Sequence, residues 1–366
     1  MRGRIAHATT VHQPFDPRIF HRELRTLAQA GYDAHLIAPH AHDERAAGVA
    51  ITALPRVASR GARWRLQAPL LAALWRLRPA LLHVHDPEVL PAAFLAKRAL
   101  GLRVIYDKHE HHLGRGLLGV VIRALEAWAY RWLDHVLLAE EAYAPFVHGV
   151  PATYVGNYVA PFSRPVAETT RRHGVERRLV QTGVLSRDRG LDRLLHLAAA
   201  IRRRGLPWRL DLIGVCHLEA DRRWAEARVQ AWGLGSVVRF VGWSRYVPWH
   251  DLMAQAAGAD AGLFLAHPIP NHRLSLHTKF YEYLALGLPI VCSAVDRWRA
   301  FVEREGVGLA VEAHEAEATL DALVHLFADA PRYDAYVHAA QAAAPRYRWN
   351  AMADRLLEVY EAVLAP

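Results

Sequence analysis

The sequence predicts an α/β protein made of two Rossmann-like domains in succession, and three observations lead to this expectation. The chain has 366 residues, the length of two domains of ordinary size. Short apolar runs alternate with stretches of helical period along most of the chain, as they do in parallel α/β units. Polar residues gather where the predicted strands end, which is the edge at which open parallel sheets bind ligands.

The composition narrows the class of protein. Hydrophobic residues make up 52% of the chain, enough for two sizeable cores. The two cysteines, Cys216 and Cys292, are far apart, so a disulfide framework is excluded and a reducing compartment is expected. No apolar run approaches the ~20 residues of a spanning helix, and the first residues lack the apolar core of a signal peptide. The sequence therefore predicts a cytoplasmic protein.

The elements of the first half can each be justified from their own residues. The helix over 15–32 is the best specified. Asp16 can cap its amino end, Phe15 and Phe20 have the spacing of a hydrophobic staple, and Gly31 can end it. Strands are expected over 4–11, 33–39, 49–55, 80–87, 103–110, 135–141 and 152–159, and further helices over 66–77, 88–100 and 117–133.

A segment with two prolines and several arginines, 156–178, separates the halves and is interpreted as a linker. A second α/β series follows, which repeats the architecture of the first half without repeating its sequence. Strands are expected over 178–185, 208–215, 237–243, 260–267 and 289–294, and helices over 190–205, 221–235, 250–256, 278–287, 315–328 and 350–364.

The stretch 104–119 carries three signals for a functional site, and two of them fail on spacing. The run 109–112 offers metal ligands, but an H-E-x-x-H zinc site needs a histidine where Leu113 stands. Consecutive side chains also diverge along a strand. The GxGxxG pattern at 114–119 begins too far after the predicted strand end for a dinucleotide fingerprint. A turn leading into a helix is the better interpretation of those glycines.

The third signal is the group Asp107, His109 and Glu110 at the end of a predicted strand. A histidine at that place can move a proton or bind a substrate hydroxyl. The alternative is an ordinary loop histidine, in a chain that has 23 histidines.

The net charge of +9 is concentrated in one segment. Six arginines and no acidic residue lie between Ala46 and His85, and tryptophans and leucines accompany them over 56–78. A basic amphipathic segment of this kind can lie on an anionic membrane surface. The alternative is a solvated helix face whose arginine stems cover apolar surface. Nucleic-acid binding is less favoured, because no recognised binding module contains these arginines.

The stretch 277–293, HTKFYEYLALGLPIVCS, resembles the signature of family-four retaining glycosyltransferases of the GT-B fold. In that signature a Lys-x-x-Glu-Tyr helix start is followed by an Ala-x-Gly-x-Pro turn and a strand. The matching residues are Lys279, Glu282, Tyr283, Ala285, Gly287 and Pro289. Other segments resemble parts of the family in the same order, namely 15–39, 81–87, 104–112, 182–195, 238–243 and 348–364.

The resemblance implies two Rossmann-like domains facing a central cleft, with a C-terminal helix that crosses back. An acceptor-side domain would comprise 1–160 with 345–366 packed on it, and a nucleotide-sugar-binding domain would comprise 161–344. The implied activity is metal-independent, retaining hexosyl transfer from a nucleotide-diphosphate sugar to an acceptor hydroxyl, in surface polysaccharide or glycolipid assembly. No cofactor, resident metal or nucleic acid is expected. The expected partners are the nucleotide sugar, a carbohydrate or lipid-linked acceptor, and the inner membrane face through 56–78.

The resemblance also implies roles for residues on the donor side. Gly183 would let the backbone approach the diphosphate. Lys279, with Arg187 or Arg189, would meet the negative charge that grows on the leaving diphosphate. Glu282 would accept hydrogen bonds from the ribose hydroxyls.

On the acceptor side, the resemblance makes His109 the active-site histidine that hydrogen-bonds the reacting sugar or the acceptor hydroxyl. Asp107 and Glu110 would orient it. The further acceptor-side residues are His85, Asp86, Asp16 and Arg18.

The chain departs from the family pattern at three positions. Leu274 stands where the family has the first glutamate of its E-x7-E motif. Val184 stands where an arginine is common, and Arg189 where a lysine is usual. Three other functions remain as alternatives: a nucleotide-sugar epimerase on the same fold, a basic nucleic-acid-binding protein, and an NAD-dependent oxidoreductase that uses the glycines of 114–119.

Overall fold

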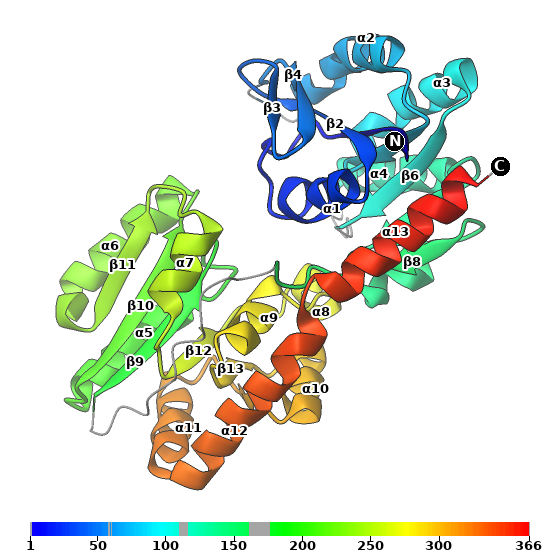
Figure 1. The fold of residues 1–366 in the computed structure, drawn as a ribbon. Coiled ribbons are helices and arrows are strands. Elements are labelled where there is room, and N and C mark those ends of the chain that lie inside the picture. Colours follow the sequence, from blue (N-terminus) through cyan, green and yellow to red (C-terminus); the bar gives the residue numbers. More distant parts are fainter. Residues whose placement is uncertain (1, 58, 60, 110–115, 161–175, 366) are drawn as a thin grey trace. The chain divides into compact units, whose positions relative to one another are not determined.

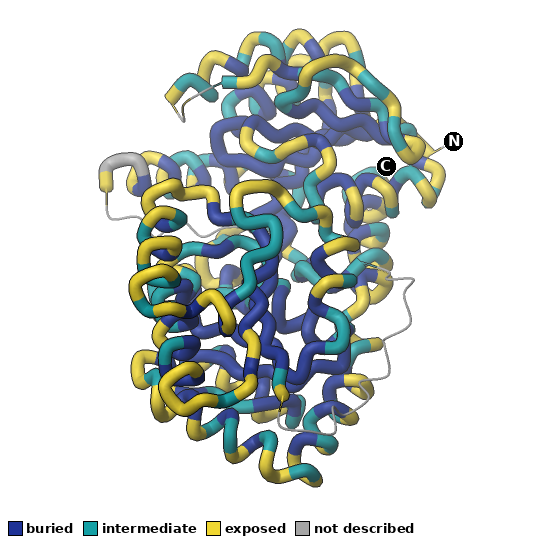
Figure 2. Tube along the Cα trace, turned by 90° about the vertical axis from the view of Figure 1, so that its left-hand side faces the viewer, coloured by how far each residue is buried: buried dark blue, intermediate teal, exposed yellow. Residues whose placement is uncertain are grey.

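The computed structural model describes residues 2–57, 59, 61–109, 116–160 and 176–365. The chain forms two compact units, Met1–Ala160 with Trp349–Pro366, and Pro161–Arg348. In each unit a mainly parallel sheet is covered by helices (Figure 1). The strands are the most deeply buried parts, and the outer faces of the helices are exposed (Figure 2).

The first unit contains the strand order β3-β4-β2-β1-β5-β6-β7-β8. All neighbouring strands are parallel except β3, which pairs antiparallel with β4 at the edge and was not predicted from the sequence. The strands are β1 (Arg2–Ala8), β2 (Tyr32–Pro39), β3 (Glu44–Ala46), β4 (Val49–Leu54), β5 (Leu81–Val84), β6 (Arg103–Lys108), β7 (His135–Leu138) and β8 (Ala152–Tyr154).

The helices of this unit include one from the far end of the chain. That helix, α13, packs beside η1 and contributes buried residues to the core of β1 and β2. The helices are η1 (Ile19–Leu24), α1 (Arg25–Gln29), η2 (Gly61–Leu66), α2 (Gln67–Leu77), η3 (Pro87–Val89), α3 (Leu90–Leu100), α4 (Leu117–Ala129), η4 (Glu141–Phe146) and α13 (Asn350–Leu364).

The predicted helix over 15–32 starts differently from a regular α-helix. Its first part, η1, is a π-helix, and α1 continues it. Asp16 still caps the amino end, because its Oδ1 accepts hydrogen bonds from the backbone N–H of Arg18 at 2.8 Å and of Ile19 at 3.0 Å. Phe15 and Phe20 pack edge to face with ring centroids 4.9 Å apart, as a staple would. The wide π-turn is a finding that helical periodicity alone does not reveal.

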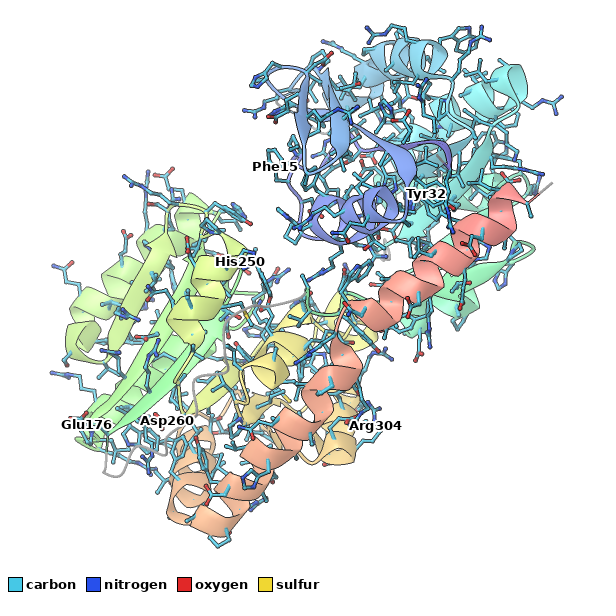
Figure 3. The ribbon with its side chains drawn as sticks, viewed as in Figure 1. Phe15, Tyr32, Glu176, His250, Asp260 and Arg304 are labelled. Carbon is cyan, nitrogen blue, oxygen red and sulfur yellow. The ribbon has the colours of Figure 1, made fainter. Side chains whose placement is uncertain are left out.

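The second unit has the parallel strand order β11-β10-β9-β12-β13-β14. Figure 3 labels Glu176 and Asp260 at the amino-terminal edge of this sheet. The strands are β9 (Arg177–Thr182), β10 (Trp208–Val215), β11 (Val238–Trp243), β12 (Ala261–Phe264), β13 (Ile290–Ser293) and β14 (Gly308–Val311).

Several elements of the second unit escaped the sequence analysis, namely β14, α8, α10 and α12. The helix α10 shows why: only Trp298, Phe301 and Val302 of its residues are buried, so its apolar stripe is narrow. The helices of the unit are α5 (Leu191–Arg203), α6 (Glu219–Ala231), η5 (Leu234–Ser236), α7 (Trp249–Ala256), α8 (Pro270–Leu274), α9 (Thr278–Ala285), α10 (Asp296–Glu305), α11 (Ala316–Ala328), α12 (Ala330–Ala343) and η6 (Ala344–Tyr347). None of the described helices is long and apolar enough to cross a membrane.

Candidate active site

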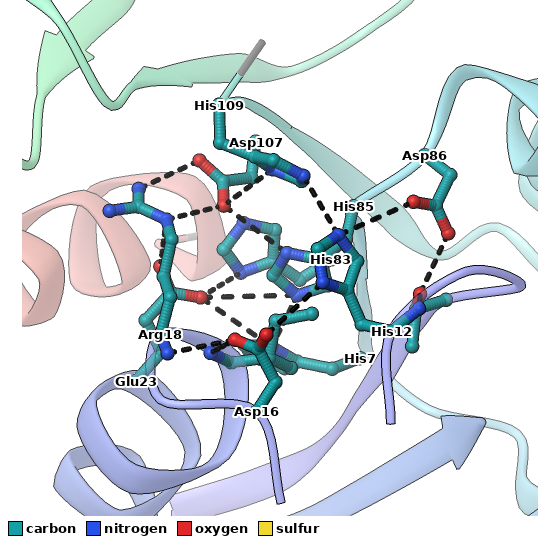
Figure 4. A network of polar contacts seen from close by, with 12 residues as sticks. His7, His12, Asp16, Arg18, Glu23, His83, His85, Asp86, Asp107 and His109 are labelled. Atoms are coloured by element: carbon teal, nitrogen blue, oxygen red, sulfur yellow. Dashed lines mark hydrogen bonds and ion pairs between the residues drawn. The ribbon is translucent and has the colours of Figure 1, made fainter. Parts of the chain in front are cut away.

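In the first unit, the neighbouring strands β1, β5 and β6 end side by side. Polar residues follow or close each of these strands: Thr9 and Thr10 after β1, His85 and Asp86 after β5, and Asp107 near the end of β6. Because the three strands are parallel, these residues meet at one edge of the sheet. Figure 4 shows how their side chains, with those of η1, form a continuous polar network.

Asp107 is the centre of this network. It is fully buried, and its two oxygens accept hydrogen bonds from Nε and Nη2 of Arg18, each at 2.7 Å. Burial opposes ionisation of Asp107, but the charge of Arg18 and hydrogen bonds from His109, His85 and Arg18 hold the pKa of its carboxyl well below the usual range. Asp107 is therefore an ionised, buried acceptor.

Arg18 is 6% exposed, and its guanidinium points inward. Besides Asp107, it contacts the carboxylate of Glu23 at 3.1 Å and donates to the carbonyl of Val155 and the side chain of Asn157. The charge of Asp107, together with that of Glu23, raises the pKa of Arg18 although burial opposes this. Because its N–H groups donate to acceptors of the protein itself, Arg18 fixes the position of Asp107.

Asp16 joins the start of η1 to the site. Its Oδ2 lies 3.1 Å from Nδ1 of His12, while its Oδ1 caps the helix. Burial would raise the pKa of Asp16, but the hydrogen bond and charge of His12 and two backbone N–H groups together lower it. Asp16 thus orients His12, a residue to which the sequence analysis assigned no role.

His109 and His12 meet at a small pocket of about 90 Å³. Their Nε2 atoms lie 3.1 Å apart, and Nδ1 of His109 lies 3.4 Å from Oδ2 of Asp107. His85 and Asp86 line the same pocket. The structure therefore brings the predicted residues His109, Asp107, His85 and Asp86 together around one opening, with His12 added to them.

Asp86 is fixed by the loop after β1. Its Oδ2 accepts hydrogen bonds from the hydroxyl of Thr9 at 2.7 Å and from the backbone N–H of Thr10 at 2.6 Å. Its Oδ1 is 3.8 Å from Nε2 of His12. The carboxylate is only 3% exposed, so its position is set by these contacts.

Two of the signals in the stretch 104–119 fall partly or wholly outside the described residues. Glu110 and the histidines at 111 and 112 are not described, and neither is Gly114. The described end of the glycine pattern leads into α4, which begins at Leu117 with Gly116 as its cap residue. This matches the expected turn before a helix.

In the second unit, Gly183 and Lys279 form the centre of a second cluster. Gly183 follows β9 with φ of +86°, and a Cβ atom there would stand 2.9 Å from Nζ of Lys279. The glycine therefore leaves room for the lysine and allows the positive φ. Lys279 lies in the first turn of α9, with its ammonium 5.2 Å from the ring centre of Phe264.

Lys279 is 5% exposed, and this burial changes its acidity. Burial and the nearby positive charge of Arg189 lower the pKa of Lys279 to about 7, although Glu282 opposes this. Arg189 and Lys279 also lower the pKa of His277, which burial alone already reduces. The cluster thus concentrates positive charge around the turn after β9 and the start of α9.

Glu282 lies one turn after Lys279 on α9. Its Oε1 accepts a hydrogen bond from the indole N–H of Trp249 at 2.9 Å, and its Oε2 accepts one from the hydroxyl of Thr182 at 3.2 Å. Trp249 begins α7, next to His250, which Figure 3 labels. Trp249 and Thr182 were not predicted from the sequence; the position of Thr182 directly before Gly183 was the signal that could have identified it.

Arg187 and Arg189, which the sequence analysis offered as alternatives, lie in different surroundings. Nε of Arg187 is 2.7 Å from Oδ1 of Asp221 on α6, and its side chain is 55% exposed. Arg189, in contrast, lies near Lys279 and His277, and its positive charge lowers the pKa of both. The structure places Arg189 in the positive cluster and ties Arg187 to α6.

The basic segment 56–78 forms η2 and α2 on the surface of the first unit; residues 58 and 60 are not described. Leu70, Ala73 and Leu74 of α2 are buried. Trp64 and Trp75 keep 38% and 45% of their surface exposed. The helix α2 thus buries one apolar stripe, while the indoles of Trp64 on η2 and Trp75 on α2 stay partly exposed.

Comparison with protein families gives two matches that lie one after the other. Residues 17–148 match the family described as Glycosyltransferase Family 4, and residues 176–329 match the one described as Glycosyl transferases group 1. The first covers β5 and β6 of the polar pocket but begins after β1, and the second covers the positive cluster.

Two curated relatives match parts of the chain. A phosphatidyl-myo-inositol mannosyltransferase of Mycobacterium leprae is 32% identical over 138 residues, 38% of this chain and 35% of the relative. A D-inositol 3-phosphate glycosyltransferase of Xylanimonas cellulosilytica is 34% identical over 92 residues, 25% of this chain and 22% of the relative. The matches therefore span about a third or less of the length of these relatives.

Solved structures match along the whole chain. A sucrose-phosphate synthase from Thermosynechococcus elongatus has a TM-score of 0.78 at 18% identity and covers 100% of both chains. Anabaena HepE in complex with UDP-glucose has a TM-score of 0.74 at 13% identity, covering 98% of this chain and 100% of the other. At these identities the matches bear on the fold, and they confirm the expected pair of GT-B-type α/β units.

Proposed function

Because the chain belongs to glycosyltransferase family four, we propose that it transfers a hexosyl group from a nucleoside-diphosphate sugar to an acceptor hydroxyl with retention of configuration. The observation that carries this proposal is the positive cluster of the second unit. That cluster contains the buried Lys279, the turn at Gly183, and Glu282, whose carboxylate accepts a hydrogen bond from Trp249. These are the groups that a diphosphate and a ribose need.

On the donor side, Lys279 and Arg189 would meet the charge that develops on the departing diphosphate. The N–H groups at the turn after Gly183 would add to them, since a glycine lets the backbone approach closely. The two oxygens of Glu282, already oriented by Trp249 and Thr182, would accept the ribose hydroxyls. We propose that these cations take the place that a metal ion has in other transferases, so no metal is required at the diphosphate.

On the acceptor side, His109 would hydrogen-bond the reacting sugar or the acceptor hydroxyl, with Asp107 orienting its ring. Arg18 and Asp16 would act as positioning residues, because both are held by contacts inside the protein. In the transfer, the bond from the anomeric carbon to the phosphate oxygen breaks and a bond to the acceptor oxygen forms on the same face. The acceptor proton passes to the leaving phosphate, so no enzymic nucleophile is needed.

The acceptor is proposed to be lipid-linked or part of a surface polysaccharide, with the protein at the inner face of the membrane. The exposed indoles of Trp64 on η2 and Trp75 on α2, two successive elements that carry arginines, support this. One relative bears the name of an enzyme acting on a phosphatidyl lipid. In flotation with phosphatidylglycerol vesicles, W75S/R76S should lose binding and Y246S, at an exposed aromatic of the second unit, should keep it. Wild-type protein that ignores anionic vesicles would contradict this part.

The first experiment measures thermal stabilisation by UDP, GDP, ADP, CMP, NAD and a short RNA. A ligand that binds the native state raises its stability by mass action, about 2.7 kcal/mol at 100 times its Kd. We expect one nucleoside diphosphate to shift the melting temperature and Glu282→Ala to remove the shift. Glu226→Ala is the matched control, because Glu226 also accepts an indole N–H, from Trp243 on β11.

The outcomes separate the alternative functions. A shift with NAD alone, or with RNA alone, would overturn the transferase proposal. If a nucleoside diphosphate binds, its sugar nucleotide is then supplied with and without an acceptor. Conversion of the donor without an acceptor would indicate an epimerase. Transfer whose product has the anomeric configuration of the donor would support retention.

A further inference from the structure

Behind the pocket of the first unit lies a buried cluster of three histidines. His7 lies on β1, His83 on β5 and His85 directly after β5, and all three are at most 1% exposed. Neighbouring ring centroids are 4.4–5.0 Å apart. Tyr360 of α13, also fully buried, faces them. His85 was expected on the acceptor side from the sequence, and the other three have no role in the proposed function.

The cluster at first looks like a metal site, because Glu23 joins the three histidines with potential ligand atoms within 4.8 Å of one another. The distances indicate something else. Nδ1 of His7 and Nε2 of His85 are 2.8 Å apart, whereas two ligands of a tetrahedral zinc, each at 2.0–2.1 Å, lie about 3.3 Å apart. A separation of 2.8 Å is that of a hydrogen bond, so these two atoms are already partners.

The direction of the hydrogen bonds can be derived from Asp107. This carboxylate is paired with Arg18 through two hydrogen bonds, so it is ionised and can only accept. Nδ1 of His85 lies 3.2 Å from Oδ2 of Asp107 and must therefore donate. Burial lowers the pKa of His85, so the ring is neutral and its Nε2 is an acceptor.

The other hydrogen bonds of the cluster take their direction from His85. Nε2 of His85 accepts, so Nδ1 of His7 donates to it. Nε2 of His7 accepts in turn, and its partner at 2.8 Å is the hydroxyl of Tyr360, which donates. The hydroxyl oxygen then accepts from Nδ1 of His83, also at 2.8 Å. Every donor in the chain His83, Tyr360, His7, His85 points toward Asp107.

A separate observation agrees with this direction. In this direction Nε2 of His83 carries a lone pair instead of a proton. The same atom has no hydrogen-bond partner in the described part of the protein. The reverse direction would require a proton on Asp107, whose oxygens already take two hydrogen bonds from Arg18, or a second proton on His85, which burial disfavours. The carboxyl oxygen Oε2 of Glu23 lies 3.8–4.0 Å from a ring nitrogen of each of the three histidines, beyond hydrogen-bond distance, and burial raises the pKa of Glu23 well above its usual range.

We propose that Tyr360 is a positioning residue of the active site. Its hydroxyl donates to Nε2 of His7 and accepts from Nδ1 of His83, so it fixes the ring of His7 against Nε2 of His85. The N–H of His85 in turn holds Asp107 in the place where Asp107 faces His109. These hydrogen bonds make the arrangement of the polar pocket depend on α13, because Tyr360 lies 353 residues after His7 in the sequence. The catalytic consequence rests on the proposed function; the tautomers do not.

The tautomers can be tested on the full wild-type chain labelled with ¹⁵N-histidine. The ring nitrogen shifts distinguish a protonated Nδ1 from a protonated Nε2. The expected result is that His7, His83 and His85 are all Nδ1–H tautomers, which is the less common form of free histidine. Nε2–H tautomers at His7 or His85, or one equivalent of zinc in the purified protein, would overturn the proposal.

Tyr360→Phe tests the positioning role, with Tyr333→Phe as its matched control. Tyr333 is also a buried tyrosine whose hydroxyl donates to a backbone carbonyl, that of Asp260 in the second unit. Tyr333→Phe loses this hydrogen bond, and Tyr360→Phe loses the two with His7 and His83. Only Tyr360→Phe should change the ring nitrogen shifts of His7 and His83 and lower kcat, by about 10- to 100-fold, with the donor KM unchanged. Unchanged ring shifts of His7 and an unchanged kcat in Tyr360→Phe would refute the positioning role.

The two proposals fail in distinguishable ways. If the wild type transfers no sugar but shows the three Nδ1–H tautomers, and Tyr360→Phe changes the ring shifts of His7 and His83, the hydrogen-bond chain stands and the proposed function falls. If the wild type transfers sugar but has other tautomers, the proposed function stands and the role of Tyr360 falls.

Discussion

At the scale of single residues, the most consequential feature is a lysine whose charge depends on pH near neutrality. Burial and the charge of Arg189 lower the pKa of Lys279 to about 7. The ammonium form predominates below that pH and is lost as pH rises through it. A bound diphosphate favours the ammonium form, so binding and protonation are linked.

We therefore predict that the affinity for the nucleoside diphosphate falls as pH rises above about 7, by up to tenfold for each pH unit. Lys279→Arg keeps its charge, so its dissociation constant should follow only the titration of the ligand's own phosphate over the same range. Lys279→Met should bind weakly at every pH. Isothermal titration calorimetry between pH 6 and pH 9 measures all three.

The arginine variant is also the control for the titration of the ligand's own phosphate, which is the same for both proteins. Parallel pH profiles for the wild type and Lys279→Arg would show that the lysine keeps its charge throughout, and would contradict the prediction.

At the scale of elements, the packing of α9 on β12 positions the donor residues. Tyr283 of α9 lies over Gly262 of β12, and its hydroxyl donates to the carbonyl of Leu263 at 3.0 Å. A Cβ atom on Gly262 would stand 2.5 Å from the ring of Tyr283. The glycine therefore lets the helix approach the strand closely enough to set Lys279 and Glu282 in place.

We predict that Gly262→Ala lowers the free energy of unfolding by about 1–3 kcal/mol, because the ring and the helix must move. The affinity for the nucleoside diphosphate should fall as well. Urea denaturation and calorimetry check both effects.

Gly235→Ala is the matched control, since a Cβ atom on Gly235 would meet nothing within 4 Å. Its free energy of unfolding should change by no more than about 0.5 kcal/mol. Equal losses of unfolding free energy in the two variants would contradict the role given to the close approach of helix and strand at Gly262.

At the scale of the whole molecule, the last helix completes the first unit. Trp349, Met352, Leu356 and Tyr360 are buried in the same core as β1 and β2, and the indole of Trp349 donates to the hydroxyl of Thr26 at 2.9 Å. The chain leaves this unit after residue 160 and returns to it at residue 349. The stability of the first sheet therefore depends on residues at the far end of the sequence.

We predict that Leu356→Ala destabilises the first unit by about 2–5 kcal/mol, because it leaves a cavity in that core. Hydrogen exchange should quicken in β1 and β2 and stay unchanged in β9 and β10. Glu358→Ala, at an exposed position of the same helix, should change neither. Faster exchange confined to the second unit would contradict the assignment of α13 to the first.

Much of the fold was predictable because it depends on local pattern. The alternation of apolar runs with helical periods located most strands and helices, and the cap at Asp16 was visible in the sequence. The elements that were missed are short or have a narrow apolar stripe, such as β3 and α10, so their periodic signal is weak. A π-turn uses the same kinds of residue as an α-turn and differs from it in hydrogen bonding, so the π-turn of η1 gave no signal in the sequence.

The fold class, the resemblance to glycosyltransferases and the groups of polar residues at the strand ends were all predictable from the residues in order. Which of these polar residues meet became known from the folded chain. Arg18 reaches Asp107 across 89 positions, and the hydroxyl of Tyr360 reaches His7 across 353. Arg189 lies in the positive cluster, while Arg187 is tied to Asp221. The physical reason is that propensity and periodicity act over neighbouring residues. Contacts between distant side chains follow from strand order, register and helix packing, which local patterns do not encode.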